Sequence, residues 1–172
     1  SKSYAILLRD EVSKSILYWD DEYEDSTGWG LMDKDGEIIV DPIYQKASIS
    51  TNGLFRVGTK KTEKYINGQG EDIFGLEFQR AYDFGNGFAA VVKNDKYGYI
   101  DEKGELVIDY QYDTVNIYFD DYGNTIVTEI NDSDERVYHL INTNNEKIIS
   151  DAKNIKGKGP YYAVKFDYDT RI

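Results

Sequence analysis

Short runs of apolar, β-branched and aromatic residues recur along this chain between polar and glycine-containing turns, a pattern that is typical of strands. In one representative stretch, Phe88–Lys93, Tyr97–Asp101 and Glu105–Asp109 are predicted strands, and a four-residue turn ending at Gly104 joins the last two. Along the repeating part of the chain, no apolar residues recur at the spacing of one helix face. The pattern therefore predicts an all-β fold.

The same arrangement recurs every 34 residues, without a gap from Leu31 to Val115. Gly36, Gly70 and Gly104 occupy one position of the repeat, and each is followed by a glutamate. A fourth copy follows after seven extra residues. The predicted copies cover residues 28–60, 61–94, 95–135 and 136–168 after a partial unit at 1–27, and we expect residues 1–172 to form a single domain.

Repeats of 34 residues are also known as helix pairs, but helix pairs need apolar residues at helical spacing. Three strands of five or six residues plus their turns fill the repeat and leave no room for a helix. We therefore predict about four tandem three-stranded repeats in an open array, because neighbouring units must stack to bury their faces. The alternative is a small propeller-like closure, with Tyr4–Leu8 pairing near Tyr161–Lys165.

The residue pattern of the repeat resembles a known family. The first copy reads Gly28-Trp29-Gly30-Leu31-Met32-Asp33, followed by Asp35-Gly36 and Asp41-Pro42, and the third reads Tyr97-Gly98-Tyr99-Ile100-Asp101. These segments resemble the bacterial WG-repeat (KWG-repeat) proteins, clearly from Gly28 to about Val115 and more weakly to Val164. The resemblance implies a repetitive β module that is often found in surface or envelope proteins, that acts by binding, and that has no general catalytic activity.

The chain departs from the family pattern at its signature residue. The tryptophan is kept only as Trp29, and Glu63, Tyr97 and Tyr138 replace it in the other copies. Family membership therefore predicts the architecture better than it predicts any site.

Composition supports the strand prediction and narrows the function. Ile, Val and Tyr number 18, 10 and 16, against 7 Ala, 8 Leu and 1 Met, so β-formers dominate over strong helix formers. The formal charge of −12 argues against nucleic acid and against an anionic membrane surface. The longest apolar run, Phe88–Val92, is too short to span a bilayer, so we expect no membrane insertion. The absence of cysteine excludes disulfides and thiolate metal sites.

Two acidic insertions precede the first strand of a copy and are the candidate partner-binding residues. The set comprises Asp20, Asp21, Glu22, Tyr23, Glu24 and Asp25 in the first insertion, and Asp132, Asp134 and Glu135 in the second. Their repeated placement suggests one acidic edge that could attract a basic protein. The alternatives are calcium binding and plain solvated loops that discourage edge pairing of strands.

Three further patterns are interpreted as structural. Asp33-Lys34-Asp35-Gly36-Glu37 looks like a calcium loop, but the other copies keep the glycine and lose the acid pair, so we expect a hairpin turn in which the acid is incidental. Gly85–Ala90 matches a dinucleotide fingerprint by spacing but opens a strand instead of a helix. The single histidine, His139, lacks triad partners at a recognisable distance. We predict no metal and no cofactor.

These features lead to a non-enzymatic binding module, with protein recognition through the acidic edge as the first hypothesis. An acidic inhibitor or immunity-type protein is one form of it. The second hypothesis is a cell-surface or carbohydrate-binding module that uses exposed tyrosines, whose candidates outside the repeat register are Tyr18, Tyr23, Tyr118, Tyr122, Tyr161 and Tyr162. A hydrolase with paired carboxylates would need a concave acidic cleft. The chain shows no signal peptide, so the compartment is open between the bacterial surface or envelope and the cytoplasm.

Overall fold

The computed structural model describes residues 5–9, 16–20 and 28–167, which form strands β1 to β17 and no helix. For β1, and for Trp19 and Asp20 of β2, only the backbone is described. Contacts divide the chain into two compact units, Ser1–Asp83 and Phe84–Ile172. We describe each unit by itself, and the prediction of a single domain over residues 1–172 stays a prediction.

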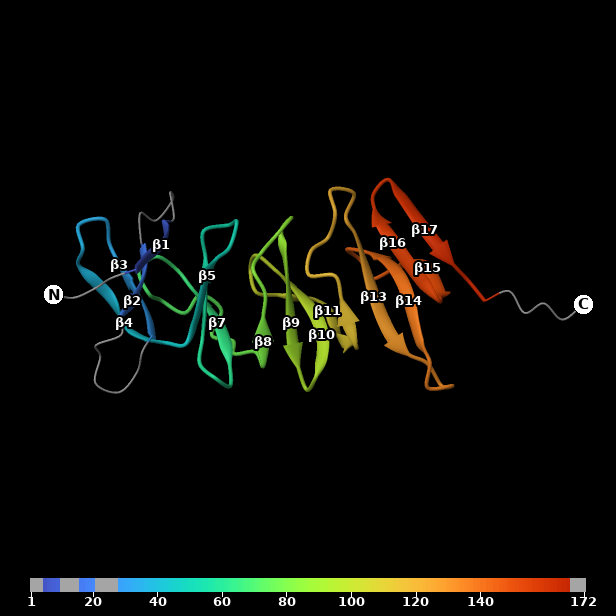
Figure 1. The fold of residues 1–172 in the computed structure, drawn as a ribbon, viewed down its shortest axis with the longest axis horizontal. Helices are drawn as coiled ribbons and strands as arrows, with labels where there is room; N and C mark the ends of the chain where they lie inside the picture. The colour runs from blue at the N-terminus through green and yellow to red at the C-terminus, as the bar shows by residue number, and fades with distance from the viewer. Residues whose placement is uncertain (1–4, 10–15, 21–27, 168–172) are drawn as a thin grey trace, which may run out of the picture. The chain divides into compact units, whose positions relative to one another are not determined.

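The first unit contains two antiparallel sheets and the short strand β8 (Arg80–Ala81) (Figure 1). One sheet has the order β1-β2-β3-β4, with bounds Ala5–Arg9, Ile16–Asp20, Gly28–Met32 and Ile38–Tyr44. The other has the order β5-β6-β7, with bounds Lys46–Ile49, Phe55–Gly58 and Glu63–Ile66. Leu17 and Leu31 of the first sheet and Phe55, Val57 and Ile66 of the second form one buried cluster. The two sheets thus share a core.

The second unit continues the same scheme. Its first three strands pair in the order β9, β10 and β11, with bounds Phe88–Lys93, Lys96–Asp101 and Leu106–Tyr112. A four-stranded sheet follows, β12-β13-β14-β15, with bounds Thr114–Val115, Asn124–Ile130, Arg136–Asn142 and Lys147–Ala152. The hairpin of β16 (Asn154–Lys158) and β17 (Tyr161–Lys165) packs on this sheet, where Ile155 joins Ile126, Leu140 and Ala152 in a buried cluster.

The predicted fold class is confirmed: the described residues are all-β, and their antiparallel sheets stand in tandem with none closed into a barrel. β9 has the predicted bounds Phe88–Lys93. The sheets are out of phase with the sequence copies, however. β5 and β6 come from copy 28–60 while their partner β7 begins the next copy, and β12-β13 precede β14-β15 in the same way. The sequence pattern also missed short strands such as β12, which forms the edge strand of a four-stranded sheet where three strands were expected.

One turn type closes six of the hairpins and loops. Asp33 Oδ1 accepts hydrogen bonds from the backbone N–H of Asp35 at 2.8 Å and of Glu37 at 2.9 Å. Equivalent bonds are made by Asn67, Asp101, Asp120, Asn131 and Asn142. The fourth residue of each turn has a positive φ, which glycine adopts most easily: Gly36, Gly70, Gly104, Gly123, Asp134 and Asn145. The expectation that the acid is incidental is therefore wrong, because its side-chain oxygen organises the turn; only its charge is dispensable.

Two buried tyrosines at one repeat position connect the strands to the following loops. The Tyr65 hydroxyl donates to the carbonyl of Tyr82, and the Tyr99 hydroxyl donates to the carbonyl of Asn116, both at 2.5 Å. Burial raises the pKa of both hydroxyls well above 10, so both are protonated donors at neutral pH. Tyr99 thereby fixes the start of the loop that forms the candidate site.

Candidate binding pocket in the second unit

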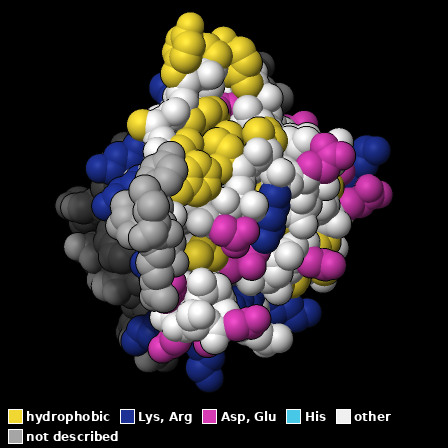
Figure 2. All heavy atoms as spheres, turned by 90° about the vertical axis from the view of Figure 1, so that its right-hand side faces the viewer, with side chains coloured by type: hydrophobic (Ala, Val, Ile, Leu, Met, Phe, Trp, Pro, Cys, Tyr) yellow, Lys and Arg dark blue, Asp and Glu magenta, His cyan; other side chains and the backbone are white. Residues whose placement is uncertain are grey.

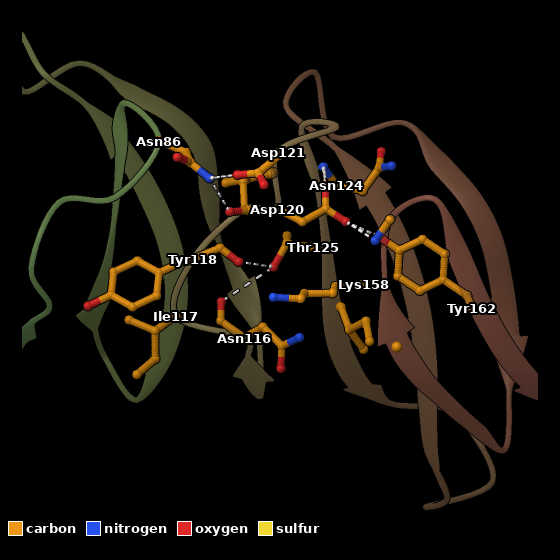
Figure 3. Close-up of a pocket in the computed structure, with 14 residues that line it drawn as sticks. Asn86, Asn116, Ile117, Tyr118, Asp120, Asp121, Asn124, Thr125, Lys158 and Tyr162 are labelled. Atoms are coloured by element: carbon orange, nitrogen blue, oxygen red, sulfur yellow. Dashed lines mark hydrogen bonds between the residues drawn. The ribbon is translucent and has the colours of Figure 1, made fainter.

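A pocket of about 560 Å³ lies within the second unit (Figure 3). Its walls come from the loop between β12 and β13, the tip of the β16–β17 hairpin, and the turn before β9. The lining residues are Asn86, Asn116, Ile117, Tyr118, Phe119, Asp120, Asp121, Asn124, Thr125, Ile126, Gly157, Lys158, Gly159 and Tyr162. Figure 3 shows Ile117 and Tyr118 on one side and Tyr162 on the other.

Asp120 holds the loop against the hairpin. Its Oδ1 closes the loop's own turn by accepting from the N–H of Tyr122 at 2.9 Å and of Asn124 at 3.0 Å. Its Oδ2 accepts from the N–H of Gly159 at 2.7 Å and from the hydroxyl of Tyr162. One carboxylate therefore binds four donors from two elements that lie about 40 residues apart in sequence.

The charge state of this carboxylate follows from its donors. Burial works to raise the pKa of Asp120, but the bonds from Tyr162, Asn124, Gly159 and Tyr122 outweigh it and lower the pKa below 3.8. Burial and the neighbouring Asp120 raise the pKa of Tyr162 to about 12. Asp120 is thus a fixed anion and Tyr162 a fixed donor near neutral pH.

The residues on either side of Asp120 are held by the turn before β9. Asn86 donates through Nδ2 to the carbonyl of Phe119 at 2.9 Å and to Asp121 Oδ1 at 3.4 Å. The buried Phe119 ring lies 5.0 Å from the Phe88 ring and 4.8 Å from the Tyr99 ring, centroid to centroid. The loop is therefore held by two elements, the turn before β9 and the β16–β17 hairpin, and a pocket formed on it is largely preformed.

Two tyrosine rings on the loop rest on glycine backbone. A Cβ atom at Gly85 would lie 2.5 Å from the ring of Tyr118, and one at Gly159 would lie 2.4 Å from the ring of Tyr122. Only glycine leaves this space. Tyr118 is 47% exposed and Tyr122 is 62% exposed, so each ring contacts a glycine and is also accessible to solvent. Gly85, which is part of the dinucleotide-like spacing, instead leaves space for the ring of Tyr118.

The polar groups of the pocket include amides, one carboxylate and one ammonium. Asn116 and Asn124 provide amides, Asp121 an exposed carboxylate, and Lys158 an ammonium group that points into the pocket in Figure 3. The buried Thr125 hydroxyl donates a hydrogen bond to the carbonyl of Tyr118 at 3.2 Å. The arrangement offers donors and acceptors beside an aromatic face.

The predicted acidic residues are distributed differently. Asp21, Glu22, Tyr23, Glu24 and Asp25 lie outside the described residues, and of Asp20 only the backbone is described, at the end of β2. Asp132, Asp134 and Glu135 form the exposed turn between β13 and β14. Glu135 Oε2 pairs with Lys153 Nζ at 2.8 Å, so part of this acidic charge is neutralised. Whether these residues bind a partner stays a prediction.

His139 is buried beneath the β14–β15 ladder with 1% of its surface exposed. Its Nδ1 accepts the N–H of Asp151 at 3.2 Å, and its Nε2 lies 3.7 Å from Glu129 Oε1. Burial and the nearby Lys147 lower the pKa of His139, against the opposing effect of Glu129 and Asp151. A buried, neutral histidine bonded to the backbone fits the structural role that we expected.

A buried ion-pair cluster in the first unit was not predicted. Glu63, 2% exposed, replaces the signature tryptophan and pairs with Lys46 Nζ at 2.6 Å and Arg56 Nη1 at 3.0 Å. It also accepts the N–H of Ala81 at 3.0 Å. Burial opposes ionisation, but these bonds lower the pKa of Glu63 below its ordinary value. The repeat register was the available signal, because it placed a glutamate where the other copies have a half-buried aromatic ring.

Among the described residues, no group of three or more His, Cys, Asp or Glu could hold a metal ion. The described part of the chain also has no helix long and apolar enough to cross a membrane.

The comparisons with known proteins decide the family. A model described as WG containing repeat matches residues 29–60, 65–97 and 97–128, which is more than half of the chain. The chain belongs to the WG-repeat family. The pocket of this WG-repeat protein combines a matched copy, which carries residues 116–126, with a hairpin that lies beyond the matched residues.

No curated protein matches this WG-repeat chain. Among solved structures, a crystal structure of a protein of unknown function from Bacteroides caccae is similar at 18% identity with a TM-score of 0.38. The similarity covers 94% of this chain and 65% of that one, so the chain spans less than two thirds of that protein.

Proposed function

We propose that this WG-repeat protein is a non-enzymatic binding module whose second unit takes a small polyhydroxylated ligand, such as the terminal residue of a glycan. The observation that carries the proposal is the half-exposed ring of Tyr118, which rests on Gly85 and lines a pocket with the amides of Asn116 and Asn124. Sugars present an apolar C–H face and a hydroxyl edge, which an aromatic ring and side-chain amides complement. The pocket volume of about 560 Å³ falls within the usual range for small ligands.

Catalysis by paired carboxylates receives little support from the pocket. Hydrolysis of a glycosidic bond needs one carboxyl group with a raised pKa to protonate the leaving group. The pKa of Asp120 is lowered instead, and all four of its bonds serve the loop and the hairpin. Binding without turnover is the simpler use of this arrangement.

The proposal is tested by titrating the whole chain with a panel of monosaccharides and following backbone amide NMR signals. Tyr118→Ala should weaken binding by about tenfold or more, since it removes the stacking face. Tyr161→Ala is the matched control, because Tyr161 is 84% exposed and does not line the pocket. Shifts confined to residues outside the pocket, or equal losses in both variants, would contradict the proposal.

A protein partner is the second candidate. Asp132 and Asp134 are exposed at the turn between β13 and β14, and no ion pair is recorded for either. On the face drawn in Figure 2, however, acidic and basic side chains are interspersed instead of forming one acidic surface. Binding of a basic protein that is lost at high salt, and lost in Asp132→Asn/Asp134→Asn at low salt, would favour this candidate over the sugar.

A further inference from the structure

The pocket contains one cation that no other described residue neutralises. Lys158 lies at the tip of the β16–β17 hairpin, and its side chain runs into the pocket between Thr125 and Asn116 (Figure 3). Six other described lysines form ion pairs, namely Lys34, Lys46, Lys64, Lys96, Lys147 and Lys153, but none is recorded for Lys158. Other described lysines, such as Lys60, Lys93 and Lys103, also have no ion pair; Lys158 differs from them because its exposed side chain lines the pocket and is available to a ligand.

The carboxylates of the pocket do not serve Lys158. Asp120 is committed to four donors from the loop and the hairpin. Asp121 lies toward Asn86, whose amide contacts its Oδ1 at 3.4 Å. Neither is within 4.0 Å of the Lys158 ammonium, since no ion pair joins them. Negative and positive charge are therefore separated within one pocket.

We infer that the ligand is a sugar acid, whose carboxylate binds Lys158 while its ring stacks on Tyr118. This inference rests on the proposed function and adds the chemical class of the ligand. The Asn116 amide lines the same pocket as Lys158 and can donate to the second carboxylate oxygen. The remaining hydroxyls can bond to Asn124, whose amide donates and accepts, and to Asp121, whose carboxylate accepts.

The site favours a single negative charge over a phosphate or sulfate ester. No arginine lines the pocket, so the planar fork that holds phosphate through two parallel bonds is missing from its walls. The fixed anion of Asp120 and the exposed Asp121 also disfavour a second negative charge nearby. One lysine and one amide are sufficient partners for a carboxylate.

The test compares glucuronate with glucose, and galacturonate with galactose, by amide NMR titration of the whole chain at low and at 0.3 M salt. We expect the acid to bind about three- to tenfold more tightly than its neutral sugar, and the preference to shrink at high salt. Lys158→Met should abolish the preference for the acid over its neutral sugar. Lys156→Met, on the same strand but outside this pocket, should keep it.

The outcomes separate the inference from the proposed function. Equal binding of acid and neutral sugar, or a preference that survives in Lys158→Met, overturns the sugar-acid assignment and leaves the sugar-binding proposal standing. Tighter binding of glucose 6-phosphate than of glucuronate overturns the assignment to a carboxylate. If no sugar shifts the pocket signals, the proposed function fails and the inference fails with it.

Discussion

The bond set of Asp120 leads to a sharp prediction, because two of its bonds close a turn and two join separate elements. In Asp120→Asn the oxygen at Oδ1 can still accept from Tyr122 and Asn124, as Asn67, Asn131 and Asn142 do in their own turns. The amide nitrogen then replaces Oδ2 and faces the N–H of Gly159, where a donor meets a donor. The substitution therefore breaks the loop-to-hairpin link and spares the turn.

The magnitude follows from the two lost bonds. A hydrogen bond to a charged group contributes about 1.5–3 kcal/mol, so the pair would contribute about 3–6 kcal/mol if both groups stayed dry. Asp120 is half-buried, and water can reach the freed Gly159 N–H and Tyr162 hydroxyl. We expect a loss of about 1–3 kcal/mol in the free energy of unfolding of the second unit.

Asp101→Asn is the matched control. Asp101 Oδ1 accepts from Lys103 and Glu105, both at 2.9 Å, in the same turn geometry, and no bond is recorded for its Oδ2. The free energy of unfolding of Asp101→Asn should differ from that of the wild type by less than about 0.5 kcal/mol. Both tryptophans, Trp19 and Trp29, belong to the first unit, so their fluorescence does not report on Asp120. Urea unfolding, followed by circular dichroism, measures the stability of both variants. Hydrogen exchange of residues 153–165 separately measures how often the β16–β17 hairpin opens.

Acidification provides an independent check. Since the pKa of Asp120 is lowered from 3.8, its contribution is complete above that pH and is lost as the pH falls through the lower, folded-state value. The stability difference between wild type and Asp120→Asn should therefore shrink below about pH 4. The reasoning is refuted if Asp120→Asn and Asp101→Asn are equally stable and hairpin exchange stays at the wild-type rate in both.

Three further changes test the buried polar groups. Glu63→Gln should destabilise the first unit by about 1–3 kcal/mol in urea unfolding followed by tryptophan fluorescence, less than a fully buried pair would lose because Lys46 is half-exposed; wild-type stability would contradict this. Tyr99→Phe removes the bond to the Asn116 carbonyl and should lower the free energy of unfolding by about 1–2 kcal/mol, measured by circular dichroism. An unchanged free energy of unfolding would mean that this bond does not contribute to stability. Because the pKa of His139 is lowered from 6.5, wild type should lose stability between pH 7 and pH 5 relative to His139→Gln, and parallel pH profiles would exclude this role.

Much of the architecture could be predicted because its causes are local. Short apolar runs that follow glycine-containing turns mark β9 and β17 with their observed bounds, since a run of this length and composition suits a strand. The turns were located from glycine at the positive-φ position, but the role of the Asx side chain was missed. Its signal was present, because aspartate or asparagine occupies the first position of every such turn.

The candidate site could be predicted only in part. Of the six tyrosines outside the repeat register, Tyr118, Tyr122 and Tyr162 lie in or beside the pocket. Tyr161 is exposed outside the pocket, Tyr18 is buried instead of exposed, and Tyr23 lies outside the described residues. Nothing in the sequence joined the first three to Lys158. Composition identifies the acidic runs as candidate binding residues, but it does not reveal that Glu135 is already paired with Lys153.

The all-β class and the turns follow from neighbours a few residues apart, and the 34-residue repeat can be read directly from the sequence. Tertiary structure alone decided which strands share a sheet, why Glu63 is tolerated inside, and how Asp120 meets Gly159 across 39 residues. Such meetings depend on how sheets stack. A charge or a tyrosine therefore has the same local sequence signature whether it faces water, a counter-ion or a pocket.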